Sequence, residues 1–403
     1  MPPAECGERS MTDVDAEAAP LAGLRVVDMT IWMAGAVTGM LLADLGADVV
    51  KVESVGGDPT RAHVAPTAGE APSAGTSVSY ATFNRNKRSI ALDLATPADH
   101  ELFDRLIDRA DVFITNMSPS TITKLGIDEK TLHARNPRLI HVRGAGLGTT
   151  GPRADDLAQD MTGMAYAGML FTLSPDPEEP FAPPGALNDV ITGTYLVGGV
   201  LAALIRRNRT GQGETVTGSL LQGALWTQLG LVGSVANTVG ASTTGRPRTN
   251  PRNPMLNQYR CGDGKWIAIA AINARAWNAF VTGADIAFLL TDPQFATFDA
   301  AVANAPAMRE ALDRHFATAP ADYWLSRLRE HGVWCGPANH LEDILTDEHV
   351  AAEGYLTSLD DGRRTVAMPF TLDGHTPGNK AGPALDADRD QIVRDWALGP
   401  NAD

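Results

Sequence analysis

Between residues 24 and 144, short apolar runs alternate with stretches whose apolar residues recur at helical spacing. The runs are rich in β-branched residues, which favour strands, and each intervening stretch is long enough for one amphipathic helix. Strands separated in this way are typical of βαβ units on a parallel sheet. The first half is therefore predicted to be an α/β domain of the Rossmann-like type, with ligands at the carboxyl ends of its strands. The predicted strands are Leu24–Met29, Val49–Glu53, Ser89–Leu94, Val112–Asn116 and Arg138–Gly144.

Helices are predicted between these strands and beyond them. Val37–Leu45 has helical periodicity and stops at Gly46, and residues 155–235 are mainly helical. Within that region a glycine-dotted apolar helix runs from about Thr192 to Arg207, where basic residues and Gly211 mark its end. Later, Lys265–Ala270 predicts a strand that opens a second α/β block.

The length of 403 residues favours two domains. We expect a disordered tail over 1–19 and a large α/β domain over 20–230. A loop or linker rich in Gly, Thr, Pro, Arg and Asn follows over 231–257. A smaller α/β domain is expected over 258–337, with a C-terminal segment over 338–403 that returns to the large domain.

Composition and charge narrow the function. The formal charge of −15 gives no electrostatic basis for binding nucleic acid or an anionic membrane. Three scattered cysteines without a CxxC pair and nine histidines without ligand spacing predict neither disulfides nor a metal site. The start lacks a secretory pattern, and the longest apolar run, Tyr195 to Ile205, is shorter than a membrane span. A soluble cytoplasmic protein is expected.

A GxGxxG pattern occurs at Gly146–Gly151, after the fifth predicted strand. In a dinucleotide site this pattern follows the first strand and opens a helix, with an acidic residue about 20 residues further on. Here Pro152 comes next and no such acidic residue ends a strand. A tight loop beside a ligand, or a turn alone, is favoured over a nicotinamide site.

Two acidic positions are candidates for chemistry. Asp189 follows a Pro/Gly turn at the edge of the apolar helix, where it could cap the helix or act as a carboxylate held at the helix start. Asp160, with Asp155 and Asp156 just before it, could be part of a solvated face or a helix start. Spacing alone does not pair Asp160 with Asp189. Basic residues that could meet a phosphate are Lys87, Arg88, Lys124 and the arginines between 246 and 252.

Ordered segments across residues 20–380 resemble the class III CoA-transferase family (CaiB/BaiF type), which includes formyl-CoA and carnitine CoA-transferases. The opening Leu21–Asp28, then Leu41–Glu53 and Gly56–Arg61, is similar to the start of that family. The match continues through the segments Asn84–Ser89, Ala110–Asn116, Asn136–Ile140, Gly146–Pro152, Arg209–Gly213 and Cys335–Pro337.

The resemblance implies that Asp189 is the covalent nucleophile, because the family's Asp precedes a glycine-dotted helix closed by a T-G-x-G turn, here Thr210–Gly213. It implies a relay through mixed anhydrides and an aspartyl-CoA thioester. An ionised carboxylate suits this chemistry because it needs no general base. Coenzyme A is the implied cofactor, as substrate, with an acyl-CoA donor and a carboxylic acid acceptor as partners. An interlocked homodimer is also implied.

The family's CoA groove corresponds here to Trp32, Met33, Ala34, Leu92, Asn116, Met117 and Lys124. Several positions depart from formyl-CoA transferase: Met33 replaces a Gln, Ser54 an Arg and Ala36 a Pro. That particular activity is therefore not expected. Lys124 stands where relatives often have Arg, so it offers phosphate a point charge rather than a bidentate fork. Asp160, Gln159 and Met33 are possible supporting residues.

Two other functions remain open. An α-methylacyl-CoA racemase of the same fold uses a His where this chain has Gln159, and a glutamine does not shuttle protons at neutral pH. A non-catalytic CoA-binding homologue would bind CoA without turnover. The sequence does not identify the donor and acceptor acids.

Overall fold

The computed structural model describes residues 19–62, 77–241 and 245–399, so the expected tail over 1–19 lies almost wholly outside the described residues. The chain forms two compact units, which are described separately. Unit 1 comprises the described residues within Met1–Met169, Pro183–Asn237 and Gly354–Asp403. Unit 2 comprises those within Leu170–Ala182 and Thr238–Glu353.

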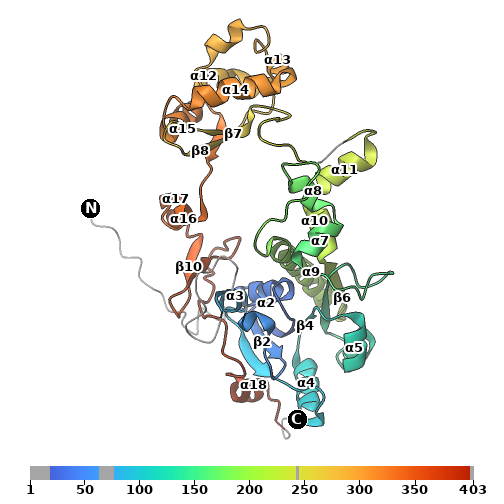
Figure 1. The fold of residues 1–403 in the computed structure, drawn as a ribbon. Helices are drawn as coiled ribbons and strands as arrows, with labels where there is room; N and C mark the ends of the chain where they lie inside the picture. Colours follow the sequence, from blue (N-terminus) through green and yellow to red (C-terminus); the bar gives the residue numbers. More distant parts are fainter. Residues whose placement is uncertain (1–18, 63–76, 242–244, 400–403) are drawn as a thin grey trace, which may run out of the picture. The chain divides into compact units, whose positions relative to one another are not determined.

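Unit 1 is built on a six-stranded sheet in which all neighbouring strands run parallel. The strand order is β3-β2-β1-β4-β5-β6, so the direction of winding reverses between β1 and β4. Figure 1 labels β2, β4 and β6 of this sheet. In doubly wound sheets ligands bind outside the carboxyl ends of the strands at this reversal. The predicted parallel α/β sheet is confirmed. The strands are β1 (Arg25–Met29), β2 (Asp48–Glu53), β3 (Arg88–Ala91), β4 (Val112–Thr115), β5 (Ile140–Ala145) and β6 (Thr215–Ser219).

Helices cover both faces of this sheet because consecutive strand residues are apolar and point to opposite sides. On one face, Val26, Val112 and Val142 pack against α2 and α9. On the other face, Val27 and Phe113 pack against α4 and α18. The helices of unit 1 are α2 (Ala34–Asp44), α3 (Val78–Phe83), α4 (Pro97–Arg109), α5 (Pro119–Leu125), α6 (Glu129–Arg135), α7 (Asp160–Tyr166), α9 (Leu187–Thr210), α10 (Leu220–Thr227), α11 (Leu229–Asn237) and α18 (Arg389–Asp395), with a 3-10 turn, η1 (Pro59–Arg61).

Unit 2 contains a three-stranded antiparallel sheet, β7 (Leu256–Arg260), β8 (Trp266–Ala270) and β9 (Trp334–Pro337). Its apolar core combines aliphatic side chains with aromatic ones from the strands and helices, among them Tyr259, Trp277, Phe316 and Trp324. Helix α8 (Met169–Leu173) lies where the chain passes from unit 1 to unit 2. The remaining elements are α12 (Ala274–Gly283), η2 (Ala287–Thr291), α13 (Phe298–Ala303), α14 (Ala305–Phe316), α15 (Ala321–Glu330), α16 (Leu341–Ile344) and α17 (Glu348–Ala352), with a hairpin in unit 1 of β10 (Leu356–Ser358) and β11 (Arg364–Val366).

Three features differ from the sequence expectation. Strand β6 was not predicted, because Thr215–Ser219 has only one apolar residue and lies at the half-buried edge of the sheet. The segment expected to be a loop over 231–257 contains most of α11 and the first residues of β7. Residues 338–353, expected in the C-terminal segment, group with unit 2, whereas Gly354 onward groups with unit 1.

Helix α9 begins at Leu187, five residues before the predicted start at Thr192. Among the described residues it is the one helix long and apolar enough to cross a membrane by length and composition. In this structure it packs along α2 and against the strands of the sheet, as a core helix does. The expectation of no membrane association stays a prediction.

Candidate active site

Asp189 lies in the first turn of α9, two residues after the helix begins at Leu187. It is therefore not the helix cap, which is Ala186 and makes no side-chain capping bond. The side chain is partly buried, so it can be reached from solvent although most of its surface is covered. The amino end of this 24-residue helix favours a negative charge, which suits an ionised carboxylate.

Asp160 supplies the cap that Asp189 does not. Its Oδ1 accepts a hydrogen bond from the backbone N–H of Asp189 at 2.8 Å. Asp160 is itself the first residue of α7, so the starts of α7 and α9 are joined at this point. The structure thus brings together two acidic residues that are 29 positions apart in the sequence. The contact joins the backbone of Asp189 to the side chain of Asp160.

Asn188 also holds the start of α9 in place. Its side chain is buried, and its Nδ2 donates to the carbonyl of Leu220 at 3.0 Å, at the start of α10. A Cβ on Gly163 would lie 3.1 Å from this Nδ2, so α7 also packs closely here. Asp189 therefore sits on a helical turn held between α7 and α10.

The two carboxyl groups have raised pKa values. Burial, followed by repulsion from Asp160, raises the pKa of Asp189 to about 7. Burial also raises the pKa of Asp160, although the N–H groups of Asp189 and Asn188 oppose this shift. A carboxyl group that titrates near neutrality in a partly open site is typical of a functional acid, base or nucleophile. Of these two carboxyl groups, Asp189 has the larger pKa shift.

The loop after β1 lies at the reversal of the sheet. Asn116, just past the end of β4, accepts a hydrogen bond from Ile31 N–H at 2.9 Å and donates to Ile31 O at 2.6 Å. Trp32 has a left-handed backbone with φ of 62°, which is uncommon for a bulky residue, and its side chain is exposed. The predicted CoA-binding residues Trp32 and Asn116 therefore lie at neighbouring positions of one edge.

This loop also contacts α9. A Cβ on Gly193 would lie 2.5 Å from Ala34 O, and Thr38 of α2 donates to Gly193 O at 3.1 Å. Gly193 is one helical turn after Asp189, so close packing of α2 on α9 places the loop beside the first turn of α9. Among the predicted residues, the loop and Asp189 are thus brought together.

A small cavity of about 90 Å³ lies at the carboxyl ends of β4 and β5. It is lined by Asn116, Met117 and the GxGxxG loop, whose Gly148 and Gly151 have positive φ. No helix begins at this loop, since the next one is α7 at Asp160, so it lacks the geometry of a dinucleotide turn. The interpretation as a tight loop beside a cavity agrees with this geometry.

Arg143 lines the same cavity and was missed at the sequence level. Its Nε is buried and has no hydrogen-bond partner among the residues that the structure describes. A buried guanidinium nitrogen of this kind is suited to an anionic ligand. Its position at the carboxyl end of β5, just before the glycine loop, is the signal that could have identified it.

The other predicted site residues are dispersed. The Leu92 side chain is buried in the core, so only its backbone faces the sheet edge, whereas Met117 is half-buried against that core. Lys124 is exposed in the last turn of α5. Met33 is half-buried where α2 begins, and Gln159 is exposed at the start of α7.

Three of the basic residues considered for phosphate are engaged elsewhere. Lys87 is fully buried against Asp28 at 2.7 Å. Arg88 pairs with Asp48 at 2.5 Å, and Arg248 pairs with Asp313 at 2.7 Å. These side chains already have counter-charges, so we do not assign them to a phosphate. Across residues 19–62, 77–241 and 245–399, no group of three His, Cys, Asp or Glu side chains is placed to hold a metal.

Comparison with known proteins identifies the family of this chain. The profile of CoA-transferase family III matches residues 21–389. The chain is similar to a succinate–glutarate CoA-transferase of Agrobacterium fabrum (32% identity, covering 88% of this chain and 89% of that one). It is also similar to a succinyl-CoA–D-citramalate CoA-transferase of Chloroflexus aurantiacus (30% identity, 93% and 94% covered). A CAIB/BAIF family protein from Brucella suis has a similar structure, with a TM-score of 0.82 at 31% identity over 94% of this chain and 99% of that one. The chain belongs to CoA-transferase family III.

Proposed function

We propose that this protein transfers CoA from a dicarboxylic acyl-CoA thioester to a free carboxylic acid, with Asp189 as the covalent nucleophile. The observation that carries the proposal is the partly buried carboxylate of Asp189 on the first turn of α9, beside the loop at the sheet reversal. The dicarboxylic donor is suggested by the succinyl and glutarate substrates in the names of the relatives.

The proposed relay has four transfers and returns the enzyme unchanged. The Asp189 carboxylate attacks the thioester carbonyl of the donor, giving a mixed anhydride and CoA thiolate. The thiolate attacks the aspartyl carbonyl, giving an aspartyl-CoA thioester and the free donor acid. The acceptor carboxylate attacks this thioester, giving a second anhydride and CoA thiolate. The thiolate then attacks the acceptor carbonyl, giving the new acyl-CoA and the Asp189 carboxylate.

The surrounding residues would bind and orient CoA. The loop Trp32–Ala34, the backbone at Leu92 and the Asn116–Met117 segment lie at the carboxyl edge of the sheet, where ligands of such sheets bind. Lys124 would meet a phosphate from the end of α5, and Arg143 adds a cation within the cavity.

A transfer assay tests this proposal. The protein is incubated with succinyl-CoA and isotopically labelled glutarate, and labelled glutaryl-CoA is followed by mass spectrometry. We expect labelled glutaryl-CoA, a parallel-line (ping-pong) pattern when both substrates are varied, and no CoA release without an acceptor. Hydrolysis of the thioester without transfer, for every donor and acceptor in a panel of dicarboxylic acids, would contradict the proposal.

Replacing Asp160 with Asn should shift the pH dependence of transfer. Asp189 must be ionised to attack, so in the wild type kcat/KM is expected to fall as the pH drops below about 7. The introduced amide oxygen can still accept the Asp189 N–H but carries no charge, so the pKa of Asp189 should fall and the acid limb should move to lower pH. The check is a pH profile with Asp108→Asn, an exposed acid on α4, as a charge-matched control. If the acid limbs of the pH profiles of Asp160→Asn and the wild type coincide, the charge of Asp160 does not raise the pKa of Asp189.

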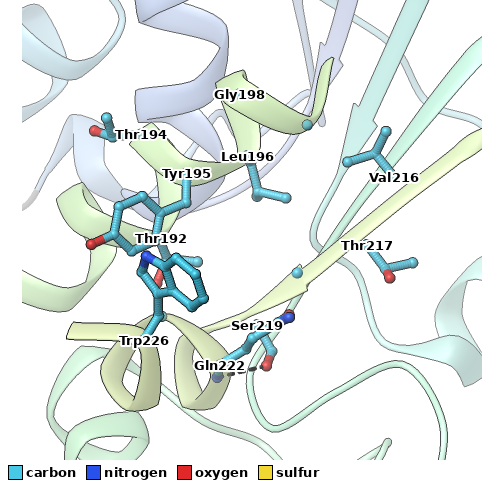
Figure 2. Close-up of a pocket in the computed structure, with 13 residues that line it drawn as sticks. Thr192, Thr194, Tyr195, Leu196, Gly198, Val216, Thr217, Ser219, Gln222 and Trp226 are labelled. Atoms are coloured by element: carbon cyan, nitrogen blue, oxygen red, sulfur yellow. Dashed lines mark hydrogen bonds between the residues drawn. The ribbon is translucent and has the colours of Figure 1, made fainter. Parts of the chain in front are cut away.

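We further propose that a second copy of the chain covers the outer face of α9, α10 and α11, forming the homodimer. A cavity of about 430 Å³ lies between α9, β6 and α10, and Tyr195 and Trp226 are among the residues that line it (Figure 2). Helix α11 has an apolar sequence but no buried residue, and Trp226 and Leu229 are 59% and 60% exposed. Exposed apolar surface of this extent on neighbouring helices is typical of an interface between chains.

Two charges on α11 should break this interface. In the Leu229→Glu/Val232→Glu variant, both substitutions lie on a helix that buries no residue within its own chain, so the fold should tolerate them. We expect the wild type to sediment as a dimer and the variant as a folded monomer. Measurement is by analytical ultracentrifugation with circular dichroism, and Lys130→Glu on α6 is the surface control. A wild type that remains monomeric at all concentrations would contradict the proposal.

A further inference from the structure

A cluster of charged side chains is buried beneath the loop that follows β1. Lys87 Nζ donates to Asp28 Oδ2 at 2.7 Å and to the carbonyl of Ala36, in the first turn of α2, at 2.9 Å. Lys51 Nζ lies 3.1 Å from Asp58 Oδ2. Lys87, Asp28 and Lys51 have no exposed side-chain surface. Two lysines and two aspartates therefore balance one another inside the unit.

The cluster meets the loop at Thr30. Asp28 Oδ1 accepts from the Thr30 N–H at 3.1 Å and from its hydroxyl at 2.6 Å. Lys51 Nζ donates to Thr30 O at 2.6 Å. The N–H, hydroxyl and carbonyl of one residue are thus all held by buried charges. The next two residues are Ile31, which Asn116 clamps, and the left-handed Trp32.

This arrangement has a cost that apolar packing would avoid. Desolvation by burial is large enough to lower the pKa of Lys87 to about 8 despite its contact with Asp28. Buried ion pairs are often no more stabilising than apolar side chains of the same size. They do, however, fix a geometry, and a strained backbone such as that of Trp32 persists only where its surroundings hold it. The cluster is therefore better explained by the placement of the loop than by stability alone.

Helix α2 connects the buried cluster to the first turn of α9, which carries Asp189. Lys87 holds the carbonyl of Ala36, and two residues later Thr38 donates to Gly193 O on α9. Gly193 is one turn beyond Asp189. We infer that Asp28, Lys51 and Lys87 are positioning residues, which set the loop Thr30–Ala36 against the first turn of α9 so that a thioester held by the loop meets Asp189. This inference rests on the proposed function, because it concerns the same reaction.

Two variants from one segment test it. Lys87→Met removes the charge under the loop, whereas Arg85→Met breaks the buried pair of Arg85 with Asp44, at 2.6 Å, at the other end of α2. Both should lower the melting temperature. In single turnovers with saturating succinyl-CoA, we expect adduct formation on Asp189 to slow at least about tenfold in Lys87→Met and less than about twofold in Arg85→Met. Equal slowing in both variants, or no slowing in Lys87→Met, would overturn the inference.

Thr30→Val keeps every charge and removes only the hydrogen bonds of the Thr30 hydroxyl. It therefore tests the positioning of the loop even if Lys87→Met does not fold. Its adduct formation should also slow, with a smaller change in melting temperature. Hydrogen–deuterium exchange of peptides covering 26–40 gives a readout that needs no chemistry: exchange at 30–36 should rise in Thr30→Val and stay at the wild-type level in Arg85→Met. If the wild type forms no adduct, the proposed function fails, and this exchange comparison still confirms or refutes the anchoring of the loop.

Discussion

Replacing Asp189 with Asn is expected to lower CoA transfer by at least about 10³-fold, because a neutral amide lacks the nucleophilic carboxylate oxygen that forms the acyl-enzyme bond. The amide has nearly the same shape and keeps the backbone N–H that Asp160 accepts. Loss of activity should therefore come without loss of structure. The measurement is the rate of labelled glutaryl-CoA formation. Residual transfer within about tenfold of the wild type would show that Asp189 is not the nucleophile.

The same substitution should stabilise the protein. Burial and Asp160 raise the pKa of Asp189 to about 7, so its charged form costs folding free energy at neutral pH and above. Asn carries no charge, and the melting temperature should rise by about 2 °C or more at pH 8. Because the raised pKa makes the folded wild type bind a proton more tightly, the difference should shrink as the pH falls toward 4. A variant less stable than the wild type at pH 8 would contradict this account.

Adding one methyl group at Gly193 should have the second large effect. A Cβ there would lie 2.5 Å from Ala34 O and 2.7 Å from the Val37 Cβ, so α2 and α9 would have to move apart. Because one of these atoms belongs to the backbone, no side-chain rotation relieves the contact. Gly193→Ala is expected to cost about 1–3 kcal/mol of stability. It should also reduce transfer by about tenfold or more, because it separates the loop from Asp189.

Gly198 provides the matched control on the same helix. A Cβ at Gly198 would meet no atom of its own chain within 4 Å, so within the chain Gly198→Ala adds the same methyl group without a clash. Alanine also favours the helix over glycine, by about 0.5–1 kcal/mol. Denaturant unfolding should show destabilisation by Gly193→Ala and stabilisation by Gly198→Ala. If the two variants shift stability in the same direction, the packing of α2 on α9 is not as tight as described.

The sheet could be predicted from the sequence where the strands are apolar. The strands predicted over Val49–Glu53 and Val112–Asn116 correspond to β2 and β4. They could be recognised because buried parallel strands need largely continuous apolar runs. The edge strand β6 could not be recognised in the same way, since Thr215–Ser219 is mostly half-buried and has no apolar run. Helix α9 was predicted, but its start was not, because the apolar pattern begins after the first turn that carries Asp189.

From the sequence, site residues could be predicted only where a residue belongs to a segment that resembles the family, and not where contacts between distant segments define the site. Asp189 and the loop Trp32–Ala34 were identified through the resemblance, and the structure brings them together through Gly193. The contact of Asp160 with the Asp189 N–H joins residues on two helices, so spacing along the chain did not reveal it. Lys87 was considered for a phosphate because a phosphate-bearing ligand at the sheet edge would need basic residues. The structure shows that it is fully buried against Asp28, a contact between distant segments that a single sequence does not encode locally.

The most direct test of the central claim is mass spectrometry of the protein after incubation with succinyl-CoA, followed by proteolysis and mapping of the modified peptide. The account predicts a CoA-sized adduct on the peptide containing Asp189, removed by hydroxylamine and absent from Asp189→Asn. An adduct on a different residue, or rapid transfer by a protein that forms no adduct under any donor concentration, would contradict covalent catalysis by Asp189.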